Sequence, residues 1–175
     1  TVDSFEAPEA DVAGKRTFVW RNGEVGAPLI KRPAVAADTF TFDTSHTNVG
    51  FAVKHMVIST VKGRFNDFSG VITYDPQDVT KSSVEVTIKT ASIDTGNADR
   101  DKHLKSADFF DAEKYPEITF KSTRIEKRGS GYVAHGPLTM HGVTKQVELP
   151  FTVTGVSNDP WGNTRLGADV EPVKV

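Results

Sequence analysis

The chain of 175 residues contains no cysteine. This absence excludes disulfides, thiolate catalysis and zinc sites built from cysteine. The chain also lacks an apolar run of the roughly 20 residues that a membrane-spanning helix needs. A formal net charge of −2 argues against a nucleic-acid binder, which needs a basic face. The 37% of hydrophobic residues are enough to form the core of one domain.

Residues 1–37 differ in composition from the rest of the chain. They open with a polar segment, continue with a strand-like run at 17–20 and the turn dipeptide Asn22-Gly23, and end in a stretch rich in proline and alanine. We expect an N-terminal extension or linker over residues 1–37, which could add one strand, and a β-barrel domain over residues 38–175.

Apolar and polar residues alternate from Asp38 onward. The alternation is strict at 84–89 and recurs at 49–55, 117–121 and 147–153, with glycine, proline and asparagine turns between these runs. Many short strands with one apolar face predict an all-β barrel or sandwich. Pro150 interrupts the last run and indicates a sheet edge or a bulge there.

One segment, residues 97–108, is typical of a helix. Asn97 and Asp99 are candidates for its N-cap, and the segment ends before Phe109 and Phe110. Because Leu104 and Ala107 are its only clear inward-facing apolar residues, we expect the helix to lie over the barrel and not inside it.

Four local patterns follow one another in the same order along the chain. They are DTSHTNVGFAVKH at 43–55, GRFNDFSG at 63–70, the segments SIDT, RDKHLKSADFF and KYPEITF within 92–120, and GPLTMHGVTK at 136–145 with DPWG at 159–162 and Arg165 after it. Together they resemble the YceI-like family of lipocalin-like, polyisoprenoid-binding proteins over about residues 38–167. The resemblance implies an extended antiparallel β-barrel with one short helix over it, which holds a polyprenyl quinone or polyprenyl carrier lipid.

The same resemblance implies no catalytic residue, no metal and no cofactor besides the bound lipid. Many relatives are exported, so we expect a periplasmic or secreted protein whose signal peptide has been removed. The start at Thr1 fits that expectation, and a trimmed chain would begin in the same way.

The end of the chain departs from the family pattern. Relatives usually continue past the position of residues 165–167 with two more strands, whereas the sequence here ends at Val175 without matching them. Three explanations remain open: a shortened chain, a closing strand from residues 17–20, or closure by a partner chain. The third leaves room for a homodimer, since open strand edges promote association.

The alternation selects residues for the ligand-binding interior, although it would equally fill a dry core. The candidates are Val49, Phe51, Val53, His55, Val84, Val86, Ile88, Phe109, Phe110, Ile118, Phe120, Leu138, Met140, Leu149 and Phe151. Phe109 and Phe110 could anchor the helix or gate the mouth of the barrel. Arg100, Asp101 and His103 could receive a polar head group, or they could form a solvated face or a local salt bridge.

Enzymatic motifs do not assemble in this sequence. The histidine pairs His46/His55 and His135/His141 lack helical metal-ligand spacing, so structural roles are expected for them. The side chains of Ser45 and His46 diverge if the two residues lie on a strand, which removes a base–nucleophile pair. Phosphate-binding and dinucleotide-binding loops are missing as well.

Two functions from different classes fit these observations. The first is a lipid-binding protein that carries or sequesters a long-chain isoprenoid, binds no nucleic acid and does not span a membrane. The alternative is a dry β-barrel that binds a protein partner through its surface or an open edge. The two differ in whether the interior is filled by the protein's own side chains.

Overall fold

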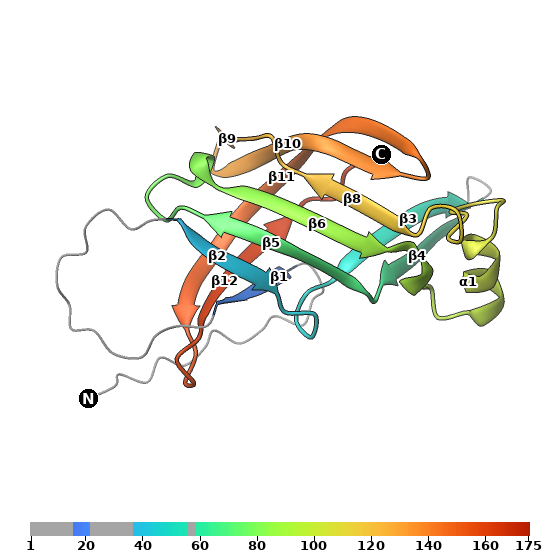
Figure 1. The fold of residues 1–175 in the computed structure, drawn as a ribbon, viewed down its shortest axis with the longest axis horizontal. Helices are drawn as coiled ribbons and strands as arrows, with labels where there is room; N and C mark the ends of the chain where they lie inside the picture. Colours follow the sequence, from blue (N-terminus) through green and yellow to red (C-terminus); the bar gives the residue numbers. More distant parts are fainter. Residues whose placement is uncertain (1–15, 22–36, 56–58) are drawn as a thin grey trace.

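The computed structural model describes residues 16–21, 37–55 and 59–175, and it shows a β-rich fold (Figure 1). The elements are β1 (Arg16–Arg21), β2 (Asp38–Phe42), β3 (Val49–His55), β4 (Ser59–Phe65), β5 (Phe68–Tyr74), η1 (Val79–Lys81), β6 (Ser83–Lys89), η2 (Thr90–Ser92), β7 (Ile93–Asp94), α1 (Ala98–Lys105), β8 (Glu117–Lys121), β9 (Arg124–Arg128), β10 (Gly131–Met140), β11 (Val143–Asn158) and β12 (Thr164–Val170).

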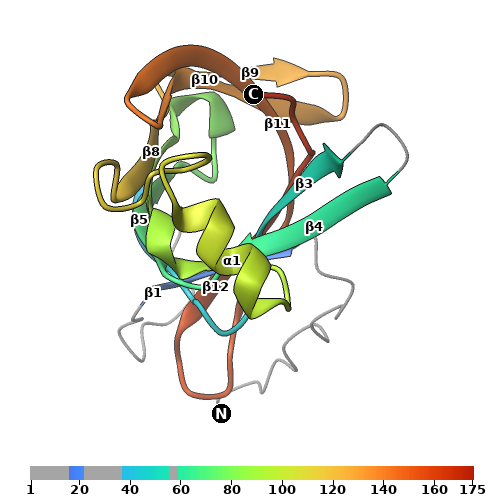
Figure 2. The same cartoon turned by 90° about the vertical axis from the view of Figure 1, so that its right-hand side faces the viewer.

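Most strands belong to one antiparallel sheet that closes on itself. Its nine strands run in the order β11-β12-β1-β2-β5-β6-β8-β10-β9, and β10 also pairs with β11. Eight of them therefore form a ring, and β9 is added beside β10 (Figure 2). This arrangement confirms the predicted antiparallel barrel with one helix.

The ring is completed by β1. This strand pairs with β12 from Arg16↔Asp169 to Arg21↔Thr164, and on its other side Val19 and Trp20 pair with Phe42 and Thr41 of β2. Of the three explanations left open for the end of the chain, the pairing corresponds to the closing strand from residues 17–20. The edges of β12 and β2 are thereby joined within one chain.

The strands β3, β4 and β7 form a separate three-stranded sheet beside the ring. Figure 2 shows its long β3–β4 hairpin near α1, which crosses one end of the barrel. The helix starts at the N-cap Asn97, whose side chain accepts a hydrogen bond from Arg100 N at 3.0 Å. It ends at Lys105, earlier than predicted, because the following chain turns back and Ala112 N donates to Lys105 O.

A sharp bend between β8 and β9 allows one edge of β10 to pair with both strands. Thr123 N bonds His135 O, and Ser122 N bonds Val84 O, where the chain leaves β8 for β9. A Cβ on Gly136 would lie only 2.1 Å from Lys121 O. The close approach of the two backbones at this corner therefore requires glycine.

Pro150 lies inside β11 opposite Val133. Its carbonyl accepts a hydrogen bond from Glu171 N, just beyond the end of β12. The N–H and C=O of one strand residue point to the same side. The N–H that proline lacks would therefore point toward the end of β12 and not toward β10, so no hydrogen bond with β10 is lost. The site is a local edge, as expected, and the bulge of β11 lies further on, between Val153 and Gly155.

Closure by β1 leads to a first prediction. Replacing Val19 with proline should lower the free energy of unfolding by about 1–3 kcal/mol, because a ladder donor is lost in the middle of β1. Val19→Thr, which keeps the β-branched shape and the N–H, is the control. Urea denaturation of both variants measures the effect. Equal stability of the two variants would show that β1 does not hold the ring together.

Candidate ligand-binding interior

The register identifies the residues that face into the ring. In an antiparallel sheet, directly opposite residues share a face. Val86 of β6 lies opposite Gly70 of β5 and Phe120 of β8, and Phe120 in turn lies opposite Leu138 of β10. An unbroken apolar row therefore crosses four strands of the ring.

The neighbouring rows on the same face are apolar as well. Ile88 pairs with Ile118, Ala134 pairs with Leu149, and Tyr132 pairs with Phe151. The residues predicted from alternation that share this inner wall are Val84, Val86, Ile88, Ile118, Phe120, Leu138, Met140, Leu149 and Phe151.

Val49, Phe51 and Phe110 lie at one end of the ring and not on its wall. Val49 and Phe51 belong to β3, and they pack with Phe110 in a cluster built on Phe65, Ile93 and Ile118. The ring of Phe110 meets those of Phe51 and Phe65 edge to face, with centroids 6.3 and 6.0 Å apart. Phe110 thus anchors the segment after α1 onto the β3–β4 sheet.

Phe109 is placed differently from its neighbour. It is 48% exposed and packs against the imidazole of His103 at 4.9 Å. Its side chain therefore lies on the outside of the helical segment. The side chains of Val53 and His55, also predicted for the interior, fall outside the described part of the structure.

The inner wall is only partly buried. Buried apolar side chains of the described residues form three separate clusters, centred on Phe40 and Leu166, on Phe65, Ile93 and Ile118, and on Phe120, Ile125 and Ala134, and a few others lie outside them. Val86, in the middle of β6, is partly exposed and belongs to none of these clusters. In a close-packed interior, an inward valine at this position would be buried.

Several wall residues were not predicted from the sequence. Phe40 and Phe42 of β2, Ile72 and Tyr74 of β5, and Leu166 of β12 gather in the first cluster. The signal was available in the alternation Thr39-Phe40-Thr41-Phe42, but a run of this length is too short to be decisive.

The charged residues at the start of α1 form hydrogen bonds with Thr95, which precedes the helix. Arg100 donates from Nε to Thr95 Oγ1 at 2.7 Å and from a terminal nitrogen to Thr95 O at 2.8 Å. Asp101 accepts hydrogen bonds from the backbone N and hydroxyl of Thr95 at 2.8 and 2.6 Å. These bonds fasten the start of α1 to the residue after β7, and His103 Nε2 lies 3.3 Å from Asp108.

The adjacent Ser45 and His46 do not form a nucleophile–base pair. Ser45 Oγ donates to Asp43 Oδ1 at 2.7 Å, and His46 Nδ1 lies 2.7 Å from the other oxygen of Asp43. Both side chains thus serve Asp43 in a turn, and the serine hydroxyl is directed to a carboxylate instead of an imidazole.

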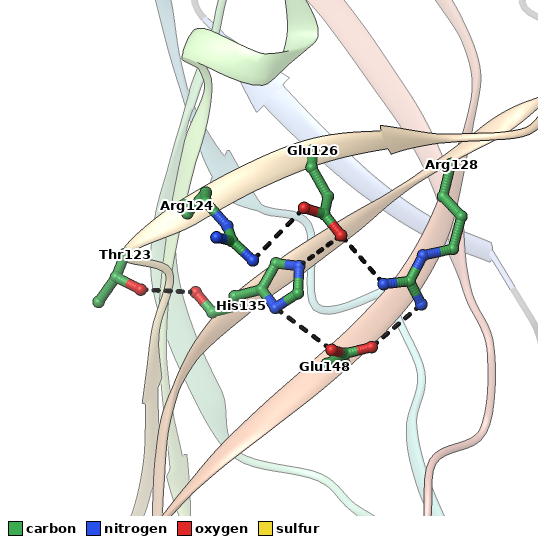
Figure 3. A network of polar contacts seen from close by, with 6 residues as sticks. All are labelled: Thr123, Arg124, Glu126, Arg128, His135 and Glu148. Atoms are coloured by element: carbon green, nitrogen blue, oxygen red, sulfur yellow. Dashed lines mark hydrogen bonds and ion pairs between the residues drawn. The ribbon is translucent and has the colours of Figure 1, made fainter.

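A polar network occupies the outer face of β9, β10 and β11 (Figure 3). His135 lies between two carboxylates, with Nε2 3.0 Å from Glu126 and Nδ1 3.6 Å from Glu148. Arg128 donates to both glutamates at 3.0 Å, and Arg124 approaches Glu126 at 3.4 Å. The contacts join the added strand β9 to β10 and, across β10, to β11.

The hairpin between β11 and β12 is fixed by a buried carboxylate. Asp159 accepts hydrogen bonds from Trp161 N at 3.0 Å and from the backbone and side chain of Asn163 at 2.8 and 3.1 Å. Burial alone raises the pKa of Asp159, but these bonds and nearby Arg165 outweigh it and hold the pKa below its ordinary value. The motif at 159–162 is therefore a structural turn that presents Trp161 to solvent.

The described residues hold no group of three or more His, Cys, Asp or Glu side chains arranged to bind a metal. In the same part of the chain, none of the helices has the length and apolar character needed to cross a membrane.

The ring, its apolar inner wall and the helix across one end define a lipocalin-like β-barrel. Residues 40–171 match the YceI-like domain, which confirms the resemblance drawn from the four motifs. The chain belongs to the YceI-like family.

Relatives of known sequence include a UPF0312 protein of Photorhabdus laumondii, 44% identical over 81% of this chain and 75% of its own. Another, from Vibrio parahaemolyticus, is 45% identical over 77% and 72% of the two chains. Among solved structures, the YCEI protein of Campylobacter jejuni is 42% identical and superposes over 73% of this chain and 75% of its own with a TM-score of 0.61. BcnA of Burkholderia cenocepacia has the same fold at 24% identity, over 73% and 97% of the two chains, with a TM-score of 0.63.

The outer network leads to a second prediction. Contacts with His135 and Arg128 hold the pKa of the Glu126 carboxyl below its ordinary value of 4.5. The network therefore stabilises the fold above pH 4.5 and loses this effect as the pH falls through the lowered pKa. Glu126→Gln should lower the Tm at neutral pH and reduce the fall in Tm on acidification.

Thermal unfolding monitored by circular dichroism between about pH 3 and pH 7 measures this difference. Glu113→Gln, at an exposed glutamate outside the network, controls for the change in net charge. A Glu126→Gln profile parallel to that of the native protein would contradict the stabilising role of the network.

Proposed function

We propose that the chain binds a long-chain apolar molecule of the isoprenoid type inside the ring, and carries or sequesters it. The observation that carries the proposal is the inner wall around Val86, which is apolar, faces inward and is left partly exposed by the surrounding side chains. Exposed apolar surface on an inner wall gains about 25 cal/mol for each Å² that a ligand covers.

The alternative, a dry barrel that binds proteins, is less consistent with this wall. A dry barrel of this size would fill its interior with its own side chains. Here five inward-facing residues remain partly exposed, although each lies on a strand of the ring that is paired on both sides. They are Val84, Ile88, Leu138, Leu149 and Phe151. The register also joins β10 to β11 and β1 to β2, which closes the ring itself, so a partner that adds a strand would have to use β9 or the sheet of β3, β4 and β7.

The placement of the polar side chains in the described structure is consistent with ligand binding without catalysis. Arg100 and Asp101 of α1 bind Thr95, and the charged side chains of the outer network bind one another. The wall rows identified above consist of apolar and aromatic residues. We therefore propose a binding protein and not an enzyme.

A pair of variants on one strand tests the proposal. Val86→Trp projects an indole into the ring, whereas Glu85→Trp places the same side chain on the exposed outer face of β6. We expect Val86→Trp to displace most of the ligand with little loss of stability. Glu85→Trp should retain it.

The measurement is organic extraction of gently purified protein followed by mass spectrometry, with the Tm of each variant recorded in parallel. The proposal fails if native protein yields no isoprenoid or other long-chain lipid. If the barrel interior is dry, Val86→Trp should instead overpack the core and cost about 1–3 kcal/mol of stability, which a lower Tm would reveal.

We propose that the protein acts outside the cytoplasm, in the periplasm or beyond it, as the resemblance to exported relatives implies. Fractionation of cells that express the natural gene at its native level should recover the protein with periplasmic or secreted markers. Recovery with cytoplasmic markers alone would contradict this placement.

A further inference from the structure

Two of the three tyrosines of the chain lie on the inner wall. Tyr132 of β10 is directly opposite Phe151 of β11. Tyr74 of β5 follows Ile72 by two residues, so it shares the inward face of Ile72, which pairs with Phe40 and Val84. The third, Tyr115, lies outside the ring strands against His141.

Each of the two rings is held by aromatic packing. Tyr74 meets Phe40 edge to face, with centroids 6.4 Å apart, and packs against the cluster of Phe40 and Leu166. Tyr132 stacks on Phe151 at 5.6 Å and packs against the cluster that contains Phe120 and Ala134. The two tyrosines therefore come from different clusters on strands that are not neighbours in the ring.

Because β5 and β10 run in opposite directions in the antiparallel ring, the end of β5 that carries Tyr74 and the start of β10 that carries Tyr132 lie at the same end of the ring. Burial raises the pKa of Tyr74 above its ordinary value, and the phenol of Tyr132 and the carboxylate of Asp75 raise it further. The Tyr74 hydroxyl consequently keeps its proton at physiological pH and can donate a hydrogen bond.

Neither hydroxyl has a hydrogen-bond partner within the part of the chain that the structure describes, although both residues are partly buried. Another polar pair on this wall is satisfied internally, since Thr164 Oγ1 donates to Asn158 Oδ1 at 2.9 Å. Two unused donors on an apolar wall match a ligand that brings one acceptor among many apolar atoms.

We propose that Tyr74 and Tyr132 bind the polar head of the ligand through an uncharged oxygen acceptor, such as a carbonyl. The inference rests on the proposed binding of a long apolar chain and assigns the position and charge of its head. The carboxylate of Asp75, adjacent to Tyr74 in the chain, makes this end of the wall unfavourable for a phosphate. Lys127 is opposite Tyr132, but it is exposed and its charge remains in water.

Competition against the neutral fluorescent probe N-phenyl-1-naphthylamine tests the assignment. Three competitors of similar chain length are compared: geranylgeranylacetone with a ketone, geranylgeranyl phosphate with an anionic head, and the hydrocarbon phytane. We expect native protein to prefer the ketone over the other two. The double variant Tyr74→Phe/Tyr132→Phe should weaken ketone binding about 10-fold and leave phytane binding unchanged.

Tyr115→Phe is the matched control and should bind all three competitors as native protein does. Tighter binding of the phosphate than of the ketone would overturn the uncharged head. Equal loss of ketone and phytane binding in the double variant, or no loss of either, would overturn the role of the two hydroxyls. If native protein binds none of the competitors and does not take up the probe, the proposed function itself fails.

Discussion

The closed register of the ring is the constraint on which the rest of the structure depends. Alternate residues of each strand point to one side, and paired strands keep their apolar residues on the same side only if the register is maintained. A slip of one residue between β6 and β8 would turn Phe120 outward and Thr119 inward. A change of register would therefore disrupt the apolar wall, the placement of its tyrosines and the charged outer face together.

The sequence predicted the wall better than it predicted the way the ring closes. Alternation is a local property, so Val84, Val86 and Ile88 could be assigned to one face from seven residues of sequence. The pairing of β1 with β12 joins residues more than 140 positions apart, as in Trp20↔Arg165, and no local pattern specifies it. The four motifs supplied the family because their order along the chain is itself long-range information.

The same alternation gave no means of dividing the strands between two sheets. Residues 49–53 follow the rule that the ring strands follow, yet β3 pairs only with β4 among the described strands. Nor could sequence spacing bring His135 between Glu126 and Glu148, since that contact needs three strands in register. Tyr74 and Tyr132 escaped prediction because a tyrosine fits either face of a strand, with an apolar ring and a polar tip.

The separate sheet of β3, β4 and β7 changes how the barrel can exchange with its surroundings. Its ladders are its own, and it meets the end of the ring in the cluster where Phe65 packs with Ile118, and through loop hydrogen bonds. Displacing it would break side-chain packing while leaving the ring ladders intact. We therefore expect the amides of β3 and β4 to undergo hydrogen exchange through a local opening that costs less free energy than opening of the ring. A long molecule could then enter or leave the interior without global unfolding.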